Sequence, residues 1–288
     1  MKTSLPLRAA LFANAIFSLS SALLMIFRPD IVERWLGIQA QTIIEVIGIG
    51  LIIFASALII LATRTRISLW LALLASMADF MWVLGSVVLV FAWPELFSQT
   101  GEWVILAVAG DVLVFGVLQL WGIAQSQRVQ ETGEYQHSIN IETNAPMESM
   151  WRVIGDLGNI KKYMPQLTSS EILGEKTPGV GAVRACSHGS QRWAEECTAF
   201  VPGHSFDVRF LTEAPDFPFP VTSMRGGWKV SPASNGSLVN VWWKYVPKHK
   251  ILSPIFVALF ARQIDRDFPG IIQRMALDAA NTQNTAHM

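Results

Sequence analysis

Charged residues are scarce in this sequence, and neither sign is in excess. Lysine, arginine, aspartate and glutamate make up 15% of the chain, and its 22 basic residues balance its 22 acidic residues. An ordinary soluble domain carries roughly 25% charged residues, so this composition indicates that part of the chain lies outside water. The chain also lacks the basic excess of a nucleic-acid-binding domain, and we therefore expect no nucleic-acid partner.

Cysteine is nearly absent as well, which excludes a disulfide-stabilised secreted fold. The chain has 2 cysteines, Cys186 and Cys197. A hairpin turning at Gly189-Ser190 would set Cys186 nearer Trp193, so we expect both thiols to be free and buried. The histidines do not have metal-ligand spacing. No phosphate-binding loop and no Ser-His-Asp or Cys-His arrangement is recognisable, so we expect neither a metal nor another cofactor.

The shortage of charge is concentrated in the first part of the chain, which is organised in long apolar runs. Residues 1–125 hold 6 basic and 7 acidic residues, whereas residues 126–288 hold 16 and 15. Each run is close to or above the roughly 20 residues that a helix needs to cross a membrane. The first run lacks the small-residue cleavage site of a signal peptide, so we expect it to be retained. The runs are Leu5–Phe27, Thr42–Ala62, Ile67–Ala92 and Trp103–Ala124.

Basic residues beside these runs predict the orientation of the helices, because they favour the cytoplasmic side. One side of the membrane would hold only Arg28 and Arg34, whose positive charge is offset by acidic neighbours. The other side would hold Lys2, Arg8, Arg64, Arg66 and Arg128. We therefore expect an integral protein of a bacterial inner membrane with both termini cytoplasmic. This part of the chain resembles uncharacterised bacterial four-helix membrane domains, a resemblance that implies no activity.

A few polar residues lie inside the runs, and they are functional candidates because burying them in a membrane is costly. They are Asn14, Glu45, Asp79 and Asp111. Asp79 and Asp111 lie near the middle of adjacent antiparallel helices, so we expect them at similar depth, as in a proton or cation relay. We favour the alternative of a protonated aspartate bonded to Asn14, Gln119 or a hydroxyl, because no further polar residues continue a path. Glu45 would reach the outer interface or bond to another helix.

The second part of the chain opens with the pattern of an α+β domain. Residues 139–142 alternate apolar and polar side chains, which predicts a half-buried strand. Asn144, Ala145 and Pro146 end this strand and begin a helix, because proline is favoured in the first helical turn. Further alternating runs follow, separated by turn signals such as an Asn-Gly pair. They predict strands at Ser169–Gly174, Ala182–Ser187, Arg192–Phe200, Ser205–Leu211, Thr222–Ser231 and Leu238–Tyr245.

This part resembles the START-like superfamily of polyketide cyclases and lipid-transport proteins (SRPBCC), whose fold is the helix-grip fold. The resemblance rests on the Ala145-Pro146 pair with a helical Trp151, an Asp-Leu-Gly-Asn turn at 156–159 and a Pro-Gly-Val-Gly segment at 178–181. It covers roughly residues 135–280. It implies a seven-stranded antiparallel sheet wrapped on a long C-terminal helix.

The stretch from Ile251 onward matches that C-terminal helix. Pro254 suits the first turn, and Pro269-Gly270 should kink the helix or split it in two. We expect its apolar stripe to pack on the sheet, with membrane contact as the alternative. The stripe consists of Leu252, Ile255, Phe256, Leu259 and Phe260.

The predicted organisation is a membrane all-α four-helix bundle followed by an α+β helix-grip domain. The bundle would span residues 1–125, a polar linker 126–134 and the helix-grip domain 135–288. A linker of about ten residues reaches at most roughly 35 Å when fully extended. We therefore expect the helix-grip domain to stay close to the membrane surface.

The resemblance implies an apolar pocket between the curved sheet and the long helix. Strand alternation assigns the inward side chains, and the loop Ala214–Val221, rich in proline and phenylalanine, would gate the pocket. Alternatively, the same bulky side chains simply fill a core. The candidate pocket residues are Trp193, Glu195, Phe210, Phe217, Phe219, Trp228, Trp243 and Tyr245.

Glu195 is the one carboxylate that alternation turns inward, and three roles are open to it. It could be a general acid or base, with Tyr245 as a second acid–base group. It could form a salt bridge with Arg184 or Arg209, or it could anchor a ligand by a hydrogen bond. No other arrangement of side chains points to catalysis.

We weigh three functions, of which the first is preferred. The first is membrane-anchored binding or transport of a hydrophobic small molecule or lipid by a cytoplasmic START-like domain, without catalysis. The second is a membrane-tethered cyclase- or dehydratase-type lyase or isomerase that uses Glu195 and Tyr245. The third is a sensor, in which the ligand of the helix-grip domain alters the four-helix bundle through Asp79 and Asp111.

Overall fold

A computed structural model describes residues 5–174 and 178–286 of the chain, which fold into two compact units. The first, here called the four-helix unit, runs to Gln127 and also includes Pro254–Arg262. The second, here called the sheet unit, consists of Arg128–Ser253 and the rest of the C-terminal helix.

The four-helix unit contains 4 helices that are long and apolar enough to cross a membrane, as the sequence predicts. Their ends lie within a few residues of the predicted runs. The helices of this unit are α1 (Leu5–Phe27), α2 (Pro29–Leu36), α3 (Gln41–Thr63), α4 (Leu69–Ala92), the 3-10 helix η2 (Pro94–Leu96) and α5 (Gln99–Gln127).

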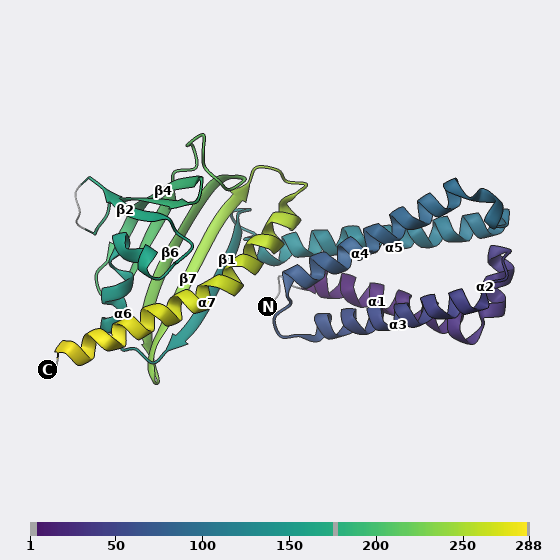
Figure 1. Ribbon diagram of the computed structural model, residues 1–288, viewed down its shortest axis with the longest axis horizontal. Coiled ribbons are helices and arrows are strands. Elements are labelled where there is room, and N and C mark those ends of the chain that lie inside the picture. Colours follow the sequence, from purple (N-terminus) through teal and green to yellow (C-terminus); the bar gives the residue numbers. More distant parts are fainter. Residues whose placement is uncertain (1–4, 175–177, 287–288) are drawn as a thin grey trace. The chain divides into compact units, whose positions relative to one another are not determined.

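The four long helices form two pairs, which Figure 1 shows in purple and teal. Helix α1 packs along α3, and α4 packs along α5, while α1 also contacts α5. Gly122 of α5 lies directly against α1, where an added Cβ would be 2.7 Å from Leu7 Cα. Such close approach through small residues is typical of helices in membranes.

Side chains on the outward faces of these helices are apolar and large. Ile53, Leu84, Met81 and Phe91 are all more than 60% exposed, at 67%, 64%, 74% and 74%. Soluble monomers rarely expose contiguous apolar surface on this scale, so these faces suit contact with lipid.

Arg8 and Gly37 each interact at the C-terminal end of a helix in this unit. The guanidinium of Arg8 donates to the carbonyls of Ala62, Arg64 and Thr65, the last two at 2.7 and 3.1 Å. These carbonyls lie at and just beyond the end of α3, where carbonyls lack partners within the helix. Gly37 ends α2 with a φ of 73°, a left-handed conformation that glycine adopts without strain.

The sheet unit is an α+β domain built on one antiparallel sheet. The strand order is β1-β7-β6-β5-β4-β3-β2, so the first strand closes one edge beside the last. Its elements are β1 (Tyr135–Thr143), α6 (Met147–Ile154), the 3-10 helix η3 (Leu157–Lys162), β2 (Ser169–Leu173), β3 (Val183–His188), β4 (Gln191–Val201), β5 (Ser205–Phe210), β6 (Val221–Ala233), β7 (Gly236–Pro247) and α7 (Ser253–Ala286).

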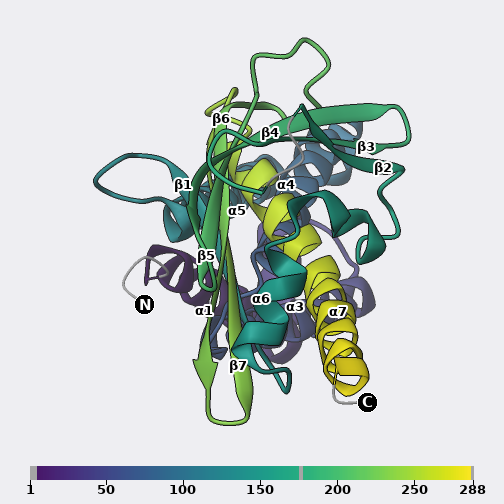
Figure 2. The same cartoon turned by 90° about the vertical axis from the view of Figure 1, so that its left-hand side faces the viewer.

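The predicted strand alternation is confirmed along β7. Val239, Val241, Trp243 and Tyr245 are buried, and the residues between them are half-buried. The sheet curves so that α6 and α7 lie on its concave face, as Figure 2 shows. The predicted fold class, a four-helix unit followed by a helix-grip domain, is therefore confirmed.

Helix α7 is continuous from Ser253 to Ala286, so of the two outcomes expected at Pro269, a kink or a split, the split does not occur. A proline inside a helix removes one hydrogen bond and costs about 3 kcal/mol. The fully buried Ile271 and Ile272 and the ring of Phe268 anchor the helix around this position and offset that cost.

The prediction that the whole apolar stripe packs on the sheet is also wrong. Leu259 is 46% exposed, because it lies on a different side of the helix from the buried Val257 and Ala261, and Leu252, 54% exposed, precedes the helix.

Candidate functional site

Glu195 forms a buried ion pair with Arg184, its direct neighbour across β3 and β4. Glu195 Oε2 accepts a hydrogen bond of 2.6 Å from Arg184 Nη2, and Oε1 accepts one of 2.8 Å from the indole N–H of Trp193. Arg184 Nη1 donates to the carbonyl of Leu157 in η3 at 2.9 Å. Both oxygens of Glu195 are thus engaged by donors that fix its position.

The electrostatics of this pair keep the arginine charged. Burial lowers the pKa of Arg184, but the negative charge of Glu195 and its hydrogen bond raise it by more, so the net shift is upward. Of the three roles open to Glu195, the geometry supports the salt bridge with Arg184. Arg209, the other partner considered, pairs with Glu196 at 2.8 Å on the exposed side of β4.

Both cysteines are free and buried, as predicted. Cys186 pairs across the hairpin with Trp193, which confirms the predicted register. Burial, followed by the charge of Glu195, raises the pKa of the Cys186 thiol to about 11. Burial also raises the pKa of Cys197. Both thiols therefore stay protonated near neutral pH and are poor nucleophiles.

The loop before β6 packs its two phenylalanines on the sheet next to this ion pair. The ring of Phe217 lies 6.5 Å from Phe210 and 5.6 Å from Phe219, between ring centroids. Phe219 in turn lies 6.3 Å from Trp193, whose indole holds Glu195. Four of the predicted pocket residues thus form one aromatic cluster, here called the loop cluster, with the carboxylate behind it.

A second group of predicted pocket residues meets α7. The ring of Phe268 lies 4.7 Å from Trp243 and 5.9 Å from Trp228, and Trp228 lies 6.5 Å from Phe206. These rings fill the space between the sheet and α7 at this level, as the core alternative expects. Sequence reasoning missed Phe268, although it precedes the proline that drew attention to this helix.

Tyr245 is buried to 1% exposure and stacks on Tyr135 with 6.1 Å between ring centroids. Burial, with a smaller effect of Tyr135, raises the pKa of its phenol above the ordinary value. A phenol that holds its proton this firmly is not suited to act as a general base at neutral pH.

Two polar contacts that sequence reasoning missed tie α7 to the rest of the sheet unit. His137 of β1 contacts Asp265 at 2.9 Å. Asp278 accepts hydrogen bonds of 2.7 Å from Lys162 and 2.5 Å from the hydroxyl of Tyr163. No local signal could have identified these pairs, because more than a hundred residues separate the partners in each.

In the four-helix unit, Asp79 is the centre of a buried hydrogen-bond network. Its Oδ2 accepts hydrogen bonds from Asn14 Nδ2 at 2.8 Å and from Gln119 Nε2 at 2.7 Å. This is the bonding between helices that the favoured alternative expects, and it joins α1, α4 and α5. Glu45 accepts a hydrogen bond of 2.8 Å from Gln41 within α3, and of its two alternatives the bond to another helix is not seen among the described residues.

The expected similar depth of Asp79 and Asp111 is wrong. Asp79 lies beside Gly116 of α5, where an added Cβ would be 3.4 Å from Asp79 Cβ. Asp111 is five residues earlier, about 7.5 Å along the helix axis at 1.5 Å per residue, and it faces outward. The midpoint of each helix is a poor guide to depth because α5, with 29 residues, is longer than α4, with 24.

A seven-stranded antiparallel sheet curved around one long C-terminal helix defines the helix-grip class of protein. Residues 128–279, more than half of the chain, match the family described as polyketide cyclase / dehydrase and lipid transport, and the chain belongs to this family. The resemblance stated from the sequence is thereby confirmed. A comparison with curated proteins finds no match.

Several solved structures are similar to about half of this chain. Norcoclaurine synthase from Thalictrum flavum is 18% identical, with 54% of this chain and 91% of that chain covered and a TM-score of 0.41. The Zhui aromatase/cyclase from a Streptomyces species is 16% identical, with 51% and 93% covered and a TM-score of 0.40. An uncharacterised protein from Bacillus thuringiensis is 21% identical, with 49% and 98% covered and a TM-score of 0.41.

Proposed function

We propose that this protein is anchored in a membrane by four helices and uses its helix-grip domain to bind or transfer a hydrophobic small molecule or lipid. The membrane is the expected reservoir of such a ligand. Helix α5 ends at Gln127 and β1 begins at Tyr135, so the chain leaves little length between the last span and the domain. By the distribution of basic residues, both termini and the domain would be cytoplasmic, as in a bacterial inner-membrane protein.

The loop cluster is the observation that carries this proposal. Trp193, Phe210, Phe217 and Phe219 come together from β4, β5 and the loop that follows β5. Aromatic side chains beside one fixed polar group are the usual lining of a small-molecule site. Phe219 and Trp193 are only half-buried, so contacts between their rings can be replaced by contacts with a bound ligand.

Binding without catalysis is the function that the polar groups favour. Glu195 has both oxygens engaged by Arg184 and Trp193, which leaves neither oxygen free to act on a substrate. Tyr245 is buried behind Tyr135 with a raised pKa, which does not favour proton transfer to a substrate. No observation favours the cyclase or dehydratase alternative over binding, or supports a sensor.

A matched pair of phenylalanine variants tests the role of the loop cluster. Phe219→Ala removes a ring of the cluster, whereas Phe200→Ala removes a ring of the same unit that contacts Trp151 at 5.5 Å. The full chain in mild detergent would be titrated with a fluorescent phospholipid and with a fluorescent isoprenoid. We expect Phe219→Ala to weaken binding of at least one probe by about tenfold, or about 1.4 kcal/mol. Equal affinities of the two variants would contradict the proposal.

A further inference from the structure

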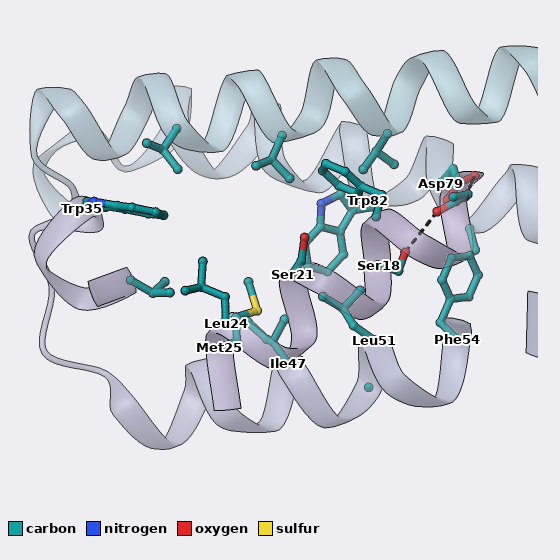
Figure 3. A pocket seen from close by; sticks show the side chains of 18 residues that line it. Ser18, Ser21, Leu24, Met25, Trp35, Ile47, Leu51, Phe54, Asp79 and Trp82 are labelled. Carbon is teal, nitrogen blue, oxygen red and sulfur yellow. Dashed lines mark hydrogen bonds between the residues drawn. The ribbon is translucent and has the colours of Figure 1, made fainter. Parts of the chain in front are cut away.

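The four-helix unit contains a cavity of its own, which is partly open and is lined only by residues of this unit. Its volume is about 380 Å³, within the range of small-molecule sites. Figure 3 shows the cavity between the α1–α3 pair and the helices α4 and α5, extending from Asp79 at one end to Trp35 of α2 at the other. Most of its wall is apolar, with Leu24, Leu51 and Phe54 among the lining residues.

One end of this cavity is polar, and its polar side chains are almost completely buried. Asn14, Ser18 and Asp79 line the cavity and are 1%, 5% and 3% exposed. Ser18 Oγ donates to Asn14 Oδ1 at 3.0 Å, and Asn14 Nδ2 donates to Asp79 Oδ2. These contacts hold the carboxyl of Asp79 in one orientation at the cavity wall.

The two oxygens of Asp79 are used unequally. Both amide donors, Asn14 Nδ2 and Gln119 Nε2, bind Oδ2, at 2.8 and 2.7 Å. Within the described parts of the chain, Oδ1 has no hydrogen-bond partner. A carboxyl oxygen without a partner in an apolar interior is costly, so a group that binds it there gains affinity and specificity.

A hydroxyl is the group that suits this oxygen. It can donate a hydrogen bond to Oδ1 when Asp79 is ionised, and it can accept one when Asp79 is protonated. A ligand carboxylate could not donate to an ionised Asp79, and the structure shows no Lys or Arg side chain in the described cavity wall to neutralise it.

We propose that this cavity binds a long apolar alcohol, with its hydroxyl on Asp79 and its chain directed along α1 toward Trp35. The chain would pass Ser21 and Trp82, which both line the cavity and appear near its middle in Figure 3. The rest of its length would contact the apolar wall. This site is independent of the function proposed for the helix-grip domain, and either can fail without the other.

Photo-crosslinking of the purified full chain in mild detergent tests this site. The probes are dodecanol carrying a diazirine near the middle of its chain and the matching diazirine-dodecane without the hydroxyl. We expect the alcohol probe to label peptides of α1, α3 and α4, about tenfold more strongly than the alkane probe, and excess dodecanol to compete. Equal labelling by both probes would overturn the proposal, since the cavity would then accept any apolar chain.

Two adjacent serines offer a matched pair of variants for the same experiment. Ser21 lines the cavity, whereas Ser20 of the same helix is exposed and does not line it. Ser21→Phe should abolish the labelling, and Ser20→Phe should leave it unchanged. Labelling that survives Ser21→Phe would place the probe elsewhere and refute the site.

A second pair of variants tests the polar end. Asp79→Leu should reduce labelling by the alcohol probe to the level of the alkane probe, while Asp111→Leu, which removes an outward-facing carboxyl, should not. If Asp79→Leu does not fold, the serine pair still decides the outcome, because Ser21 does not take part in the network that holds Asp79.

Discussion

The buried ion pair of Arg184 and Glu195 predicts how the free energy of unfolding changes when one or both charges are removed. The size of the change distinguishes a carboxylate held by the ion pair from a loosely packed one. Both side chains are 7% exposed. Replacing Glu195 by Leu leaves the guanidinium buried without its counter-charge, and breaking such a pair costs about 3–5 kcal/mol. We expect Glu195→Leu to lower the free energy of unfolding of the sheet unit by this amount.

The double variant should recover part of that loss. Arg184→Met combined with Glu195→Leu removes both charges, and replacement of a whole buried pair by apolar side chains is often neutral or stabilising. The hydrogen bonds to Leu157 and from Trp193 would still be lost, at about 1 kcal/mol each. The double variant should therefore be more stable than Glu195→Leu alone.

Hydrogen exchange measured by mass spectrometry on the full chain gives the required local free energies. Peptides over β3 and β4 should exchange about 10²–10⁴-fold faster in Glu195→Leu, since each 1.4 kcal/mol is tenfold. Glu196→Leu is the control, because the exposed pair of Glu196 and Arg209 is worth about 0–1 kcal/mol. The reasoning is refuted if the single and double variants exchange equally fast, or if the control is destabilised as much.

Two further predictions concern the packing of α5 and the attachment of α7. Gly122→Ala should lower the free energy of unfolding of the four-helix unit by about 1–3 kcal/mol, because the added methyl group overpacks the contact with α1. Gly110→Ala, with open space around the added Cβ, should have no such effect, and equal melting temperatures of the two variants would contradict this. Hydrogen bonds from Lys162 and Tyr163 lower the pKa of Asp278 below 3.8, so their stabilisation is present above this pH and lost as the pH falls through the lowered value. Exchange in α7 should rise there, and Asp278→Asn should abolish that pH dependence.

Much of the fold can be predicted from the sequence because it rests on local patterns. Apolar runs of the required length identified the four long helices, and period-two alternation identified the strands and the inward faces of β7. The register that sets Cys186 opposite Trp193 followed from one glycine turn. Each of these features depends on residues close together in the chain.

The contacts within the sites could be predicted only in part, because they depend on which distant segments meet. Asn14 and Gln119 were among the possible partners of Asp79, but the depth of Asp111 could not be judged without the offset between α4 and α5. The continuity of α7 across Pro269 depends on packing that a propensity argument does not contain.

The cavity was missed for a related reason. It lies between helix pairs, and its lining residues are distributed over α1 to α5. A sequence pattern reports which side chains are apolar, and it does not report where packed helices leave room.

The identity of the molecule that the full chain retains on gentle extraction is the most direct test of the central claim. Native mass spectrometry of the detergent-solubilised protein, with fragmentation of the released species, would measure it. The account predicts a bound lipid or other apolar molecule that Phe219→Ala loses and Phe200→Ala keeps. Protein that is soluble without detergent, or that carries no apolar molecule and binds none when lipids are added, would contradict it.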